Sequence, residues 1–181
     1  ETVLFTIALV MESKRSEMFA QGQNQHALNQ LAKVFYQHQI DQIRSGKELE
    51  STMPLGDGEA CVIVFDIVNS SAIRHENAKE FFEKIFRNCY ELMNRNYDAK
   101  TLTANAYRIK EMGDGFICSV GFPFKPVQAS KARSALALSL DFYAAFRAEV
   151  KEFGYHHPIS CGIGIAMDHV FGYFPAAGTK S

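Results

Sequence analysis

The sequence predicts an α+β fold in which two strand–helix–strand units share one antiparallel sheet. Apolar runs of strand length alternate with amphipathic helical patterns, and a Gly-Asp-Gly turn joins the two middle strands. The strand-like runs are 60–65, 104–111, 116–120 and 159–166, and the helical patterns are 77–97 and 129–153. The order strand, helix, strand, strand, helix, strand is the ferredoxin-like βαββαβ arrangement, which places both helices on one face of the sheet.

Each helical pattern carries an apolar stripe. In the first helix we expect a core side made of large residues at helical spacing: Phe81, Phe82, Ile85, Phe86, Tyr90 and Met93. The apolar residues of the second helix include Leu136, Leu140, Tyr143 and Phe146, and Gly154 ends that helix. A further short strand is expected at 170–174.

Composition limits the classes of function. The chain has 181 residues, 47% hydrophobic and 22% charged, which suits one globular domain with an appended segment. The net charge of −1 gives no basic field, so we expect no nucleic-acid partner. Four scattered cysteines without metal-ligand spacing indicate buried free thiols, and no signal peptide is recognisable. These features predict a cytoplasmic protein, and because the first residue is Glu1 we expect a piece of a longer chain.

The first 50 residues form a separate helical segment. Residues 3–11 are apolar but span about half the length of a membrane helix, so they are either the cytoplasmic end of a membrane helix or the start of an amphipathic one. A helix is predicted from about Ser13 to Arg44, and its narrow apolar stripe suits either a parallel signalling coiled coil or packing on its own domain. A turn-rich linker at 51–58 separates this transducer, 1–50, from a second domain, 59–181.

Two carboxylates stand at strand ends that this topology makes neighbours. Asp66 ends the first strand, and Asp114 lies at the tip of the hairpin. Two carboxylates at one sheet edge repel each other unless a cation binds both, and Mg²⁺ prefers one or two carboxylates completed by phosphate and water. Each Asp taken alone is also an ordinary helix cap or turn former; the pairing favours a metal site.

These two segments resemble the metal-binding segments of class III adenylate and guanylate cyclases. The family pattern Arg-Ile-Lys-x-x-Gly-Asp is matched in full by 108–114, and the pattern Phe-x-Asp-Ile-x-Gly-Phe-Thr corresponds to Val-Phe-Asp-Ile-Val-Asn-Ser-Ser at 64–71. The strand 159–166 and the helical region around 31–49 resemble the family's next strand and its transducer. The resemblance implies a class III cyclase core with an N-terminal signalling helix.

The resemblance also implies roles for single residues. Asp66 and Asp114 would bind two Mg²⁺ (or Mn²⁺), with the carbonyl of Ile67 on one of them. The backbone of Asn69, Ser70, Ser71 and Ala72 would hold the β- and γ-phosphates of ATP. Lys110 occupies the adenine-recognising position, where guanylate cyclases typically have Glu. Without the resemblance, we would interpret Lys110 as a solvent-exposed lysine on a strand.

The implied activity is conversion of ATP to 3′,5′-cyclic AMP and pyrophosphate by a two-metal mechanism. The implied assembly is a head-to-tail homodimer controlled by an upstream sensor, located in the cytoplasm or at the inner face of a membrane. Asn69 and Ser70 depart from the usual Gly and Phe, and the family's later base-recognition and transition-state residues would follow Ser181. The alternatives are a guanylate cyclase or a catalytically silent dimerisation module.

Overall fold

The computed structural model describes residues 14, 18, 22–32 and 34–173. The chain divides into two compact units, 1–52 and 53–181, and each is described by itself. The predicted apolar segment 3–11 lies outside the described residues. Within the described parts, every helix is too short or too polar to cross a bilayer.

The N-terminal unit is helical but not continuous. Residues 22–31 are helical, and the helix resumes only at α2, Gln37–Arg44, followed by α3, Leu49–Thr52. The prediction of one helix to Arg44 is therefore wrong. Tyr36 has extended backbone (φ −74°, ψ 155°) and donates its N–H to Oε1 of Gln39 at 3.0 Å, which starts a new helix. Gln39 is buried and donates its Nε2 to the carbonyl of Thr52 at 3.1 Å, tying α2 to the end of α3.

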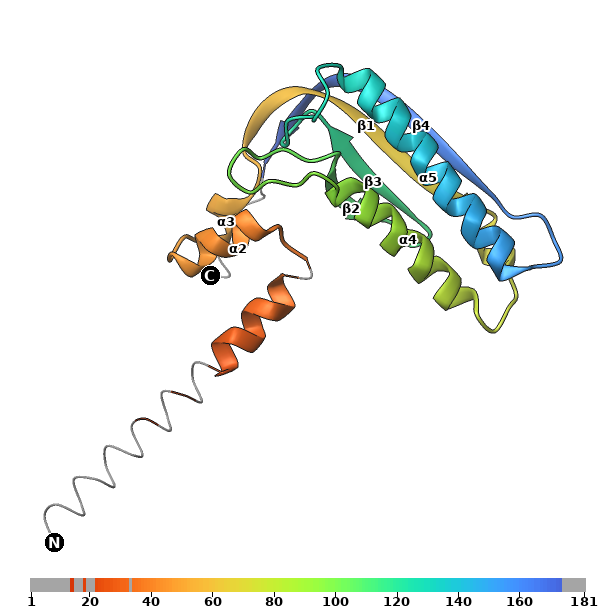
Figure 1. The fold of residues 1–181 in the computed structure, drawn as a ribbon, viewed down its shortest axis with the longest axis horizontal. Helices are drawn as coiled ribbons and strands as arrows, with labels where there is room; N and C mark the ends of the chain where they lie inside the picture. The colour runs from red at the N-terminus through yellow and green to blue at the C-terminus, as the bar shows by residue number, and fades with distance from the viewer. Residues whose placement is uncertain (1–13, 15–17, 19–21, 33, 174–181) are drawn as a thin grey trace, which may run out of the picture. The chain divides into compact units, whose positions relative to one another are not determined.

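The second unit has the predicted α+β architecture. Its strands are β1, Gly56–Val68, β2, Tyr107–Glu111, β3, Gly115–Val120, and β4, Ser160–Gly172. They form one antiparallel sheet in the order β2-β3-β1-β4, with β1 at its centre (Figure 1). The sequence order βαββαβ is confirmed.

Helices α4, Ala78–Asn94, and α5, Lys131–Phe153, run side by side over one face of the sheet (Figure 1). Alternation along β1 sends Ile63, Phe65 and Ile67 into the core beneath these helices, each at most 1% exposed. Val64 and Asp66 face the opposite side of the sheet, which neither α4 nor α5 covers (Figure 1). We call this side the open face.

The buried residues of α4 agree with the prediction, whereas those of α5 largely do not. In α4, Phe81, Ile85 and Met93 are buried as expected. In α5, Leu136, Leu140 and Tyr143 are 55%, 61% and 44% exposed, and of the four apolar residues named from the sequence only Phe146 is buried. The sheet packs against the neighbouring stripe: Ala135, Leu138, Ser139, Phe142 and Phe146.

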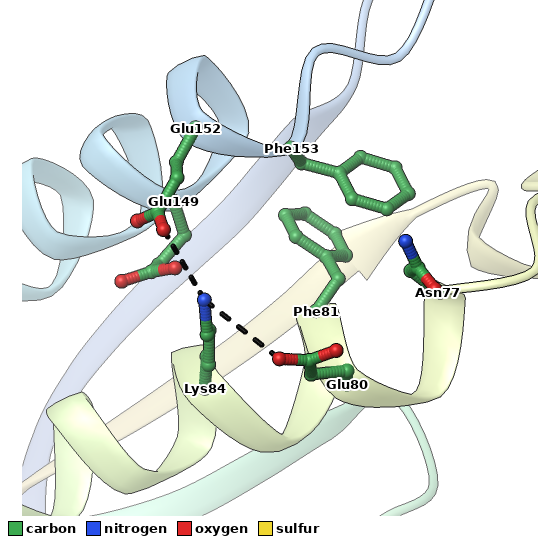
Figure 2. A pocket seen from close by; sticks show the side chains of 7 residues that line it. All are labelled: Asn77, Glu80, Phe81, Lys84, Glu149, Glu152 and Phe153. Atoms are coloured by element: carbon green, nitrogen blue, oxygen red, sulfur yellow. Dashed lines mark hydrogen bonds and ion pairs between the residues drawn. The ribbon is translucent and has the colours of Figure 1, made fainter.

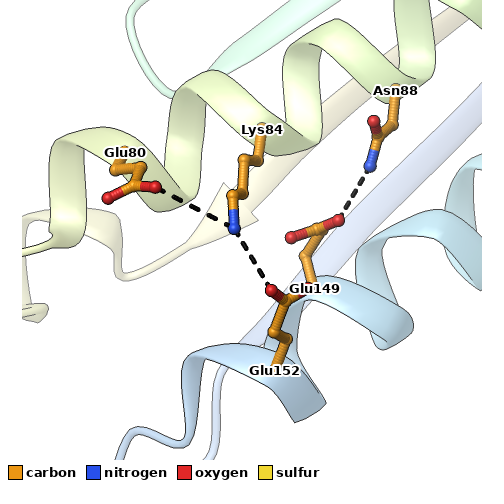
Figure 3. A network of polar contacts seen from close by, with 5 residues as sticks. All are labelled: Glu80, Lys84, Asn88, Glu149 and Glu152. Atoms are coloured by element: carbon orange, nitrogen blue, oxygen red, sulfur yellow. Dashed lines mark hydrogen bonds and ion pairs between the residues drawn. The ribbon is translucent and has the colours of Figure 1, made fainter.

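A polar ladder joins α4 to α5 above the core. Lys84 Nζ lies 3.2 Å from Glu152 Oε1 and 3.9 Å from Glu80 Oε1, and Asn88 Nδ2 donates to Glu149 Oε1 at 2.8 Å (Figure 3). The hydrogen bond that Lys84 donates to Glu152 raises the pKa of Lys84. Glu80, Lys84, Glu149 and Glu152 border a small cavity of about 190 Å³ that Phe81 and Phe153 also line (Figure 2). Such exposed pairs contribute at most about 1 kcal/mol each, so the apolar core carries the packing.

β4 is longer than predicted. The sequence suggests two strands, 159–166 and 170–174, separated by Met167-Asp-His. In the structure Ser160–Gly172 is one strand, because the central strand β1 pairs with it residue for residue from Val68↔Ser160 to Gly56↔Gly172. Phe174 lies outside the described residues.

Candidate functional site

Asp66 and Asp114 meet at one end of the sheet. Asp66 is the third-last residue of β1 and lies opposite Gly115, the first residue of β3, so the Asp114 that precedes Gly115 stands beside the end of β1. The backbone N–H of Ile67 donates to the carbonyl of Asp114 at 3.2 Å. The topology therefore brings the two predicted metal ligands together.

The hairpin tip that carries Asp114 is a tight two-residue turn. Met112 and Gly115 exchange backbone hydrogen bonds of 2.8 and 3.3 Å, which leaves Gly113 and Asp114 as the loop. Gly113 has φ +69°, a conformation that glycine adopts without the strain of a side chain. The turn thus holds Asp114 at a fixed place on the sheet edge.

The absence of a side chain at Gly115 leaves space for the side chain of Asp66. A Cβ at residue 115 would lie 2.4 Å from the carbonyl oxygen of Phe65 and 3.0 Å from Oδ1 of Asp66. The glycine therefore makes room for β1 and for the carboxylate beside it. On the other side of Asp66 lies Gly162 of β4, where an added Cβ would meet nothing within 4 Å.

The predicted phosphate loop follows β1 directly. Asn69 has φ 55°, the left-handed conformation that Asn tolerates, and Ser70–Ala72 form a single 3₁₀ turn. The Ser70 hydroxyl donates to Oδ2 of Asp114, which joins the loop to the second carboxylate. The N–H of Ala72 donates to the carbonyl of Asn69 at 2.9 Å, so this group is engaged within the loop.

Lys110 lies on the open face, the same face as Asp66. It pairs with Ile117 of β3, which in turn lies opposite Val64 of β1. Two strand spacings separate β2 from β1, about 10 Å. Arg108 faces the helices instead, with its guanidinium 4.9 Å from the centre of the Tyr90 ring.

A family model of the adenylate and guanylate cyclase catalytic domain matches residues 55–174. The chain belongs to this family. It is therefore a nucleotide cyclase catalytic domain of the adenylate or guanylate type, as the sequence motifs predict.

Solved cyclases share the fold. The adenylyl cyclase CyaB from P. aeruginosa is 14% identical, with a TM-score of 0.51 over 63% of this chain and 58% of its own. The guanylyl cyclase Cya2 is 18% identical, with a TM-score of 0.51 over 65% of this chain and 57% of its own. A bacterial light-regulated adenylyl cyclase is 18% identical, with a TM-score of 0.58 over 90% of this chain and 44% of its own. The cyclase chain thus spans less than two thirds of each of these proteins, and a search of curated proteins found no match.

The donor set of the cyclase site fits a hard divalent cation. Asp66 and Asp114 supply two carboxylates, and the described residues contain no group of three or more His, Cys, Asp or Glu side chains arranged to hold a metal. Mg²⁺ binds through one or two carboxylates and takes its other ligands from phosphate and water, whereas structural zinc sites need four protein ligands. The residues present therefore suit Mg²⁺ or Mn²⁺ bound together with a nucleotide.

Sequence reasoning missed the residues that support the phosphate loop. His75 accepts the N–H of Asn77 on Nδ1 at 3.1 Å and packs edge-on against Phe153, with the ring centres 4.5 Å apart. The hydroxyl of Tyr155 accepts the N–H of Arg74 at 3.4 Å. The end of α5 and its following loop thereby support residues 74–77, and only the spatial neighbourhood of α4 and α5 reveals this.

Proposed function

We propose that this cyclase domain converts ATP to 3′,5′-cyclic AMP and pyrophosphate. The observation that carries the proposal is the convergence of Asp66 and Asp114 at one sheet end, with Ser70 of the following loop bonded to Asp114. In the reaction the ribose 3′-oxygen forms a bond to the α-phosphorus, the bond from that phosphorus to the β-bridging oxygen breaks, and the 3′-hydroxyl proton is released.

The two carboxylates would hold two Mg²⁺ (or Mn²⁺), with the Ile67 carbonyl as a further ligand. When bound, such ions lower the pKa of the attacking hydroxyl and neutralise the leaving pyrophosphate. Asn69, Ser70 and Ser71 would orient the β- and γ-phosphates through their backbone N–H groups, with Ala72 contributing by shaping the turn. Asn69 has left-handed backbone, and Ser70, which follows it, bonds to Asp114 at the sheet edge.

Lys110 would select adenine. An ammonium group only donates hydrogen bonds, and N1 of adenine accepts one, whereas N1 of guanine carries a hydrogen and cannot. Lys110 is exposed on the open face, and the described residues offer its ammonium no hydrogen bond or ion pair. It is therefore available to a base.

The site would be completed by a second copy of the chain, head to tail. The open face leaves Val64, Val68 and Ile109 exposed by 36%, 43% and 49%, which suits burial against a partner. Lys110 of one copy would then approach the Asp pair of the other. We further propose that an upstream sensor acts on the dimer through the N-terminal helical unit, and that the protein is cytoplasmic, in keeping with its four free cysteines.

The test is turnover of ATP and GTP by the purified protein with Mg²⁺ or Mn²⁺. We expect cyclic AMP from ATP, a loss of at least about 100-fold in Asp114→Ala, and no loss in the control Asp141→Ala, which removes an exposed carboxylate from α5. Lys110→Glu should shift the preference toward GTP. A folded, dimeric protein that neither turns over nor binds ATP would favour the silent dimerisation module, and a wild-type preference for GTP would refute the role of Lys110.

A further inference from the structure

A second polar site lies at the C-terminal end of α5. A hollow of about 740 Å³ is bordered there by Arg147, Lys151, Tyr155, His156 and His157. Its remaining lining is Ala148, Val150, Pro158 and Ile159, so no carboxylate borders it. We call this hollow the basic pocket.

The two histidines share this pocket because of the local backbone. Adjacent side chains in a strand point to opposite faces, so an extended backbone would separate His156 from His157. In the structure both residues lie in a bend between α5 and β4, and both border the same hollow. The loop therefore adds two imidazoles to the cations of the helix.

Charge is segregated around the last turns of α5. Arg147 and Lys151 are four residues apart and therefore lie on one side of the helix. Glu149 and Glu152 lie toward α4, where they bond to Asn88 and Lys84 (Figure 3). These two glutamates are the acidic residues nearest to the pocket in the sequence. Because they form their bonds on the other side of the helix, they do not neutralise the positive charge of the pocket.

The pocket retains free hydrogen-bond donors. Arg147 donates one N–H to the Tyr143 hydroxyl at 3.2 Å, and its guanidinium has further N–H groups to offer. Lys151 makes no hydrogen bond or ion pair within the described part of the chain, and each imidazole has at least one ring N–H. The C-terminal end of α5 carries about half a negative charge, which opposes an anion but is smaller than the two full positive charges of Arg147 and Lys151.

We propose that the basic pocket binds a small soluble molecule carrying a multiply charged phosphate group. Phosphate oxygens accept several hydrogen bonds at once, and cationic donors converging from a helix and a loop match that geometry. Neither Asp66 nor Asp114 lines the pocket, and its own donors would hold the phosphate without a metal. Tyr155 borders it and also accepts the backbone N–H of Arg74, two residues after the phosphate loop, so an occupant would contact a residue that supports the chain beside the candidate catalytic site.

The test is calorimetric titration of the protein with inorganic pyrophosphate in EDTA, where the carboxylate pair has no cation with which to hold phosphate. We expect binding that is at least about 10-fold weaker in Arg147→Gln/Lys151→Gln. The matched control Arg87→Gln/Arg133→Gln removes the same charge from exposed positions of α4 and α5 and should leave the affinity unchanged. All four side chains are exposed, and circular dichroism should show that both variants fold.

Each outcome decides the proposal. Loss in the pocket variant alone supports it. No binding by the wild type, equal binding by both variants, or equal loss in both would overturn it. Binding only to vesicles containing phosphatidylserine would also overturn it, because the positive side chains would then meet a membrane surface. Asp114→Ala should keep pyrophosphate binding in EDTA, so this result stands apart from the success or failure of the cyclase assay.

Discussion

Replacing Gly115 by alanine should damage the site by forcing two strands apart. The new Cβ would lie 2.4 Å from the carbonyl oxygen of Phe65, and real Cβ contacts essentially never fall below 3.0 Å, so β1 and β3 must separate by about 0.6 Å at this point. The obstacle is backbone of the central strand and cannot rotate away. The same Cβ would lie 3.0 Å from Oδ1 of Asp66, so the carboxylate would also move.

The expected cost is about 1–3 kcal/mol in the free energy of unfolding, as for other overpacked interiors. For a chain of this size that corresponds to a fall in Tm of roughly 2–12 °C. Urea denaturation followed by circular dichroism measures the first quantity, and a thermal scan measures the second.

Gly162→Ala is the matched control. Gly162 flanks Asp66 from the opposite strand, yet its added Cβ would meet nothing within 4 Å. Both substitutions restrict the unfolded chain equally, so the difference between them isolates the steric effect. If Gly115→Ala proves as stable as Gly162→Ala and retains the same Mn²⁺-dependent nucleotide binding, the reasoning about this contact is refuted.

Two further predictions concern the core and the thiols. Phe116→Ala should lower the free energy of unfolding by about 3–5 kcal/mol in urea denaturation, because Phe116 is fully buried and packs edge-on against Phe142, with the ring centres 5.3 Å apart. The control Phe171→Ala, at a position 76% exposed, should change the free energy of unfolding by less than about 0.5 kcal/mol, and similar losses in the two variants would contradict the packing. Burial raises the pKa of Cys161 to about 11, so at pH 8 iodoacetamide should alkylate this thiol about 100-fold more slowly in the folded than in the unfolded protein. The rate in the folded protein should rise about tenfold per pH unit up to about pH 11. Mass spectrometry measures both rates, and equal rates at pH 8 would contradict this prediction.

The fold was predictable because its signals are local and repeated. Apolar runs of strand length, helical stripes and a Gly-Asp-Gly turn each indicate one element, and their order leaves few topologies. The helix break before α2 was not predictable in this way. It depends on the side chain of Gln39, which serves both the N–H of Tyr36 and the carbonyl of Thr52, and nothing in the periodicity marks a residue with such partners.

The buried side of α5 was mispredicted for a physical reason. The helix is rich in Ala and Leu around its circumference, so two apolar stripes are present and the sequence does not rank them. The stripe through Leu138, Phe142 and Phe146 meets the aromatic residues of β1 and β3, and packing against those rings decides the orientation. In α4 the large residues occupy mainly one side, and there the prediction succeeded.

At the candidate site, the sequence predicts the two carboxylates, but it does not predict the side chains that support the neighbouring loop. Asp66 and Asp114 could be paired from topology alone, because a hairpin beside a central strand must bring its tip to that strand's end. The supporting contacts of His75 and Tyr155 join residues from different elements, and no spacing rule links them. Their contribution depends on how α4 and α5 pack.

The face on which Lys110 lies depends on one irregularity in β2. With strict alternation Lys110 would share a face with Arg108, which points toward the helices and Tyr90. The register shifts between Arg108 and Lys110, so Arg108 pairs with Cys118 and Lys110 with Ile117, leaving Ile109 as the extra residue. The bulge turns Lys110 to the open face that carries Asp66. The Arg-Ile-Lys motif thus places one cation against the helices and presents the other to a partner or a base, and without the bulge the proposed adenine contact would not be possible.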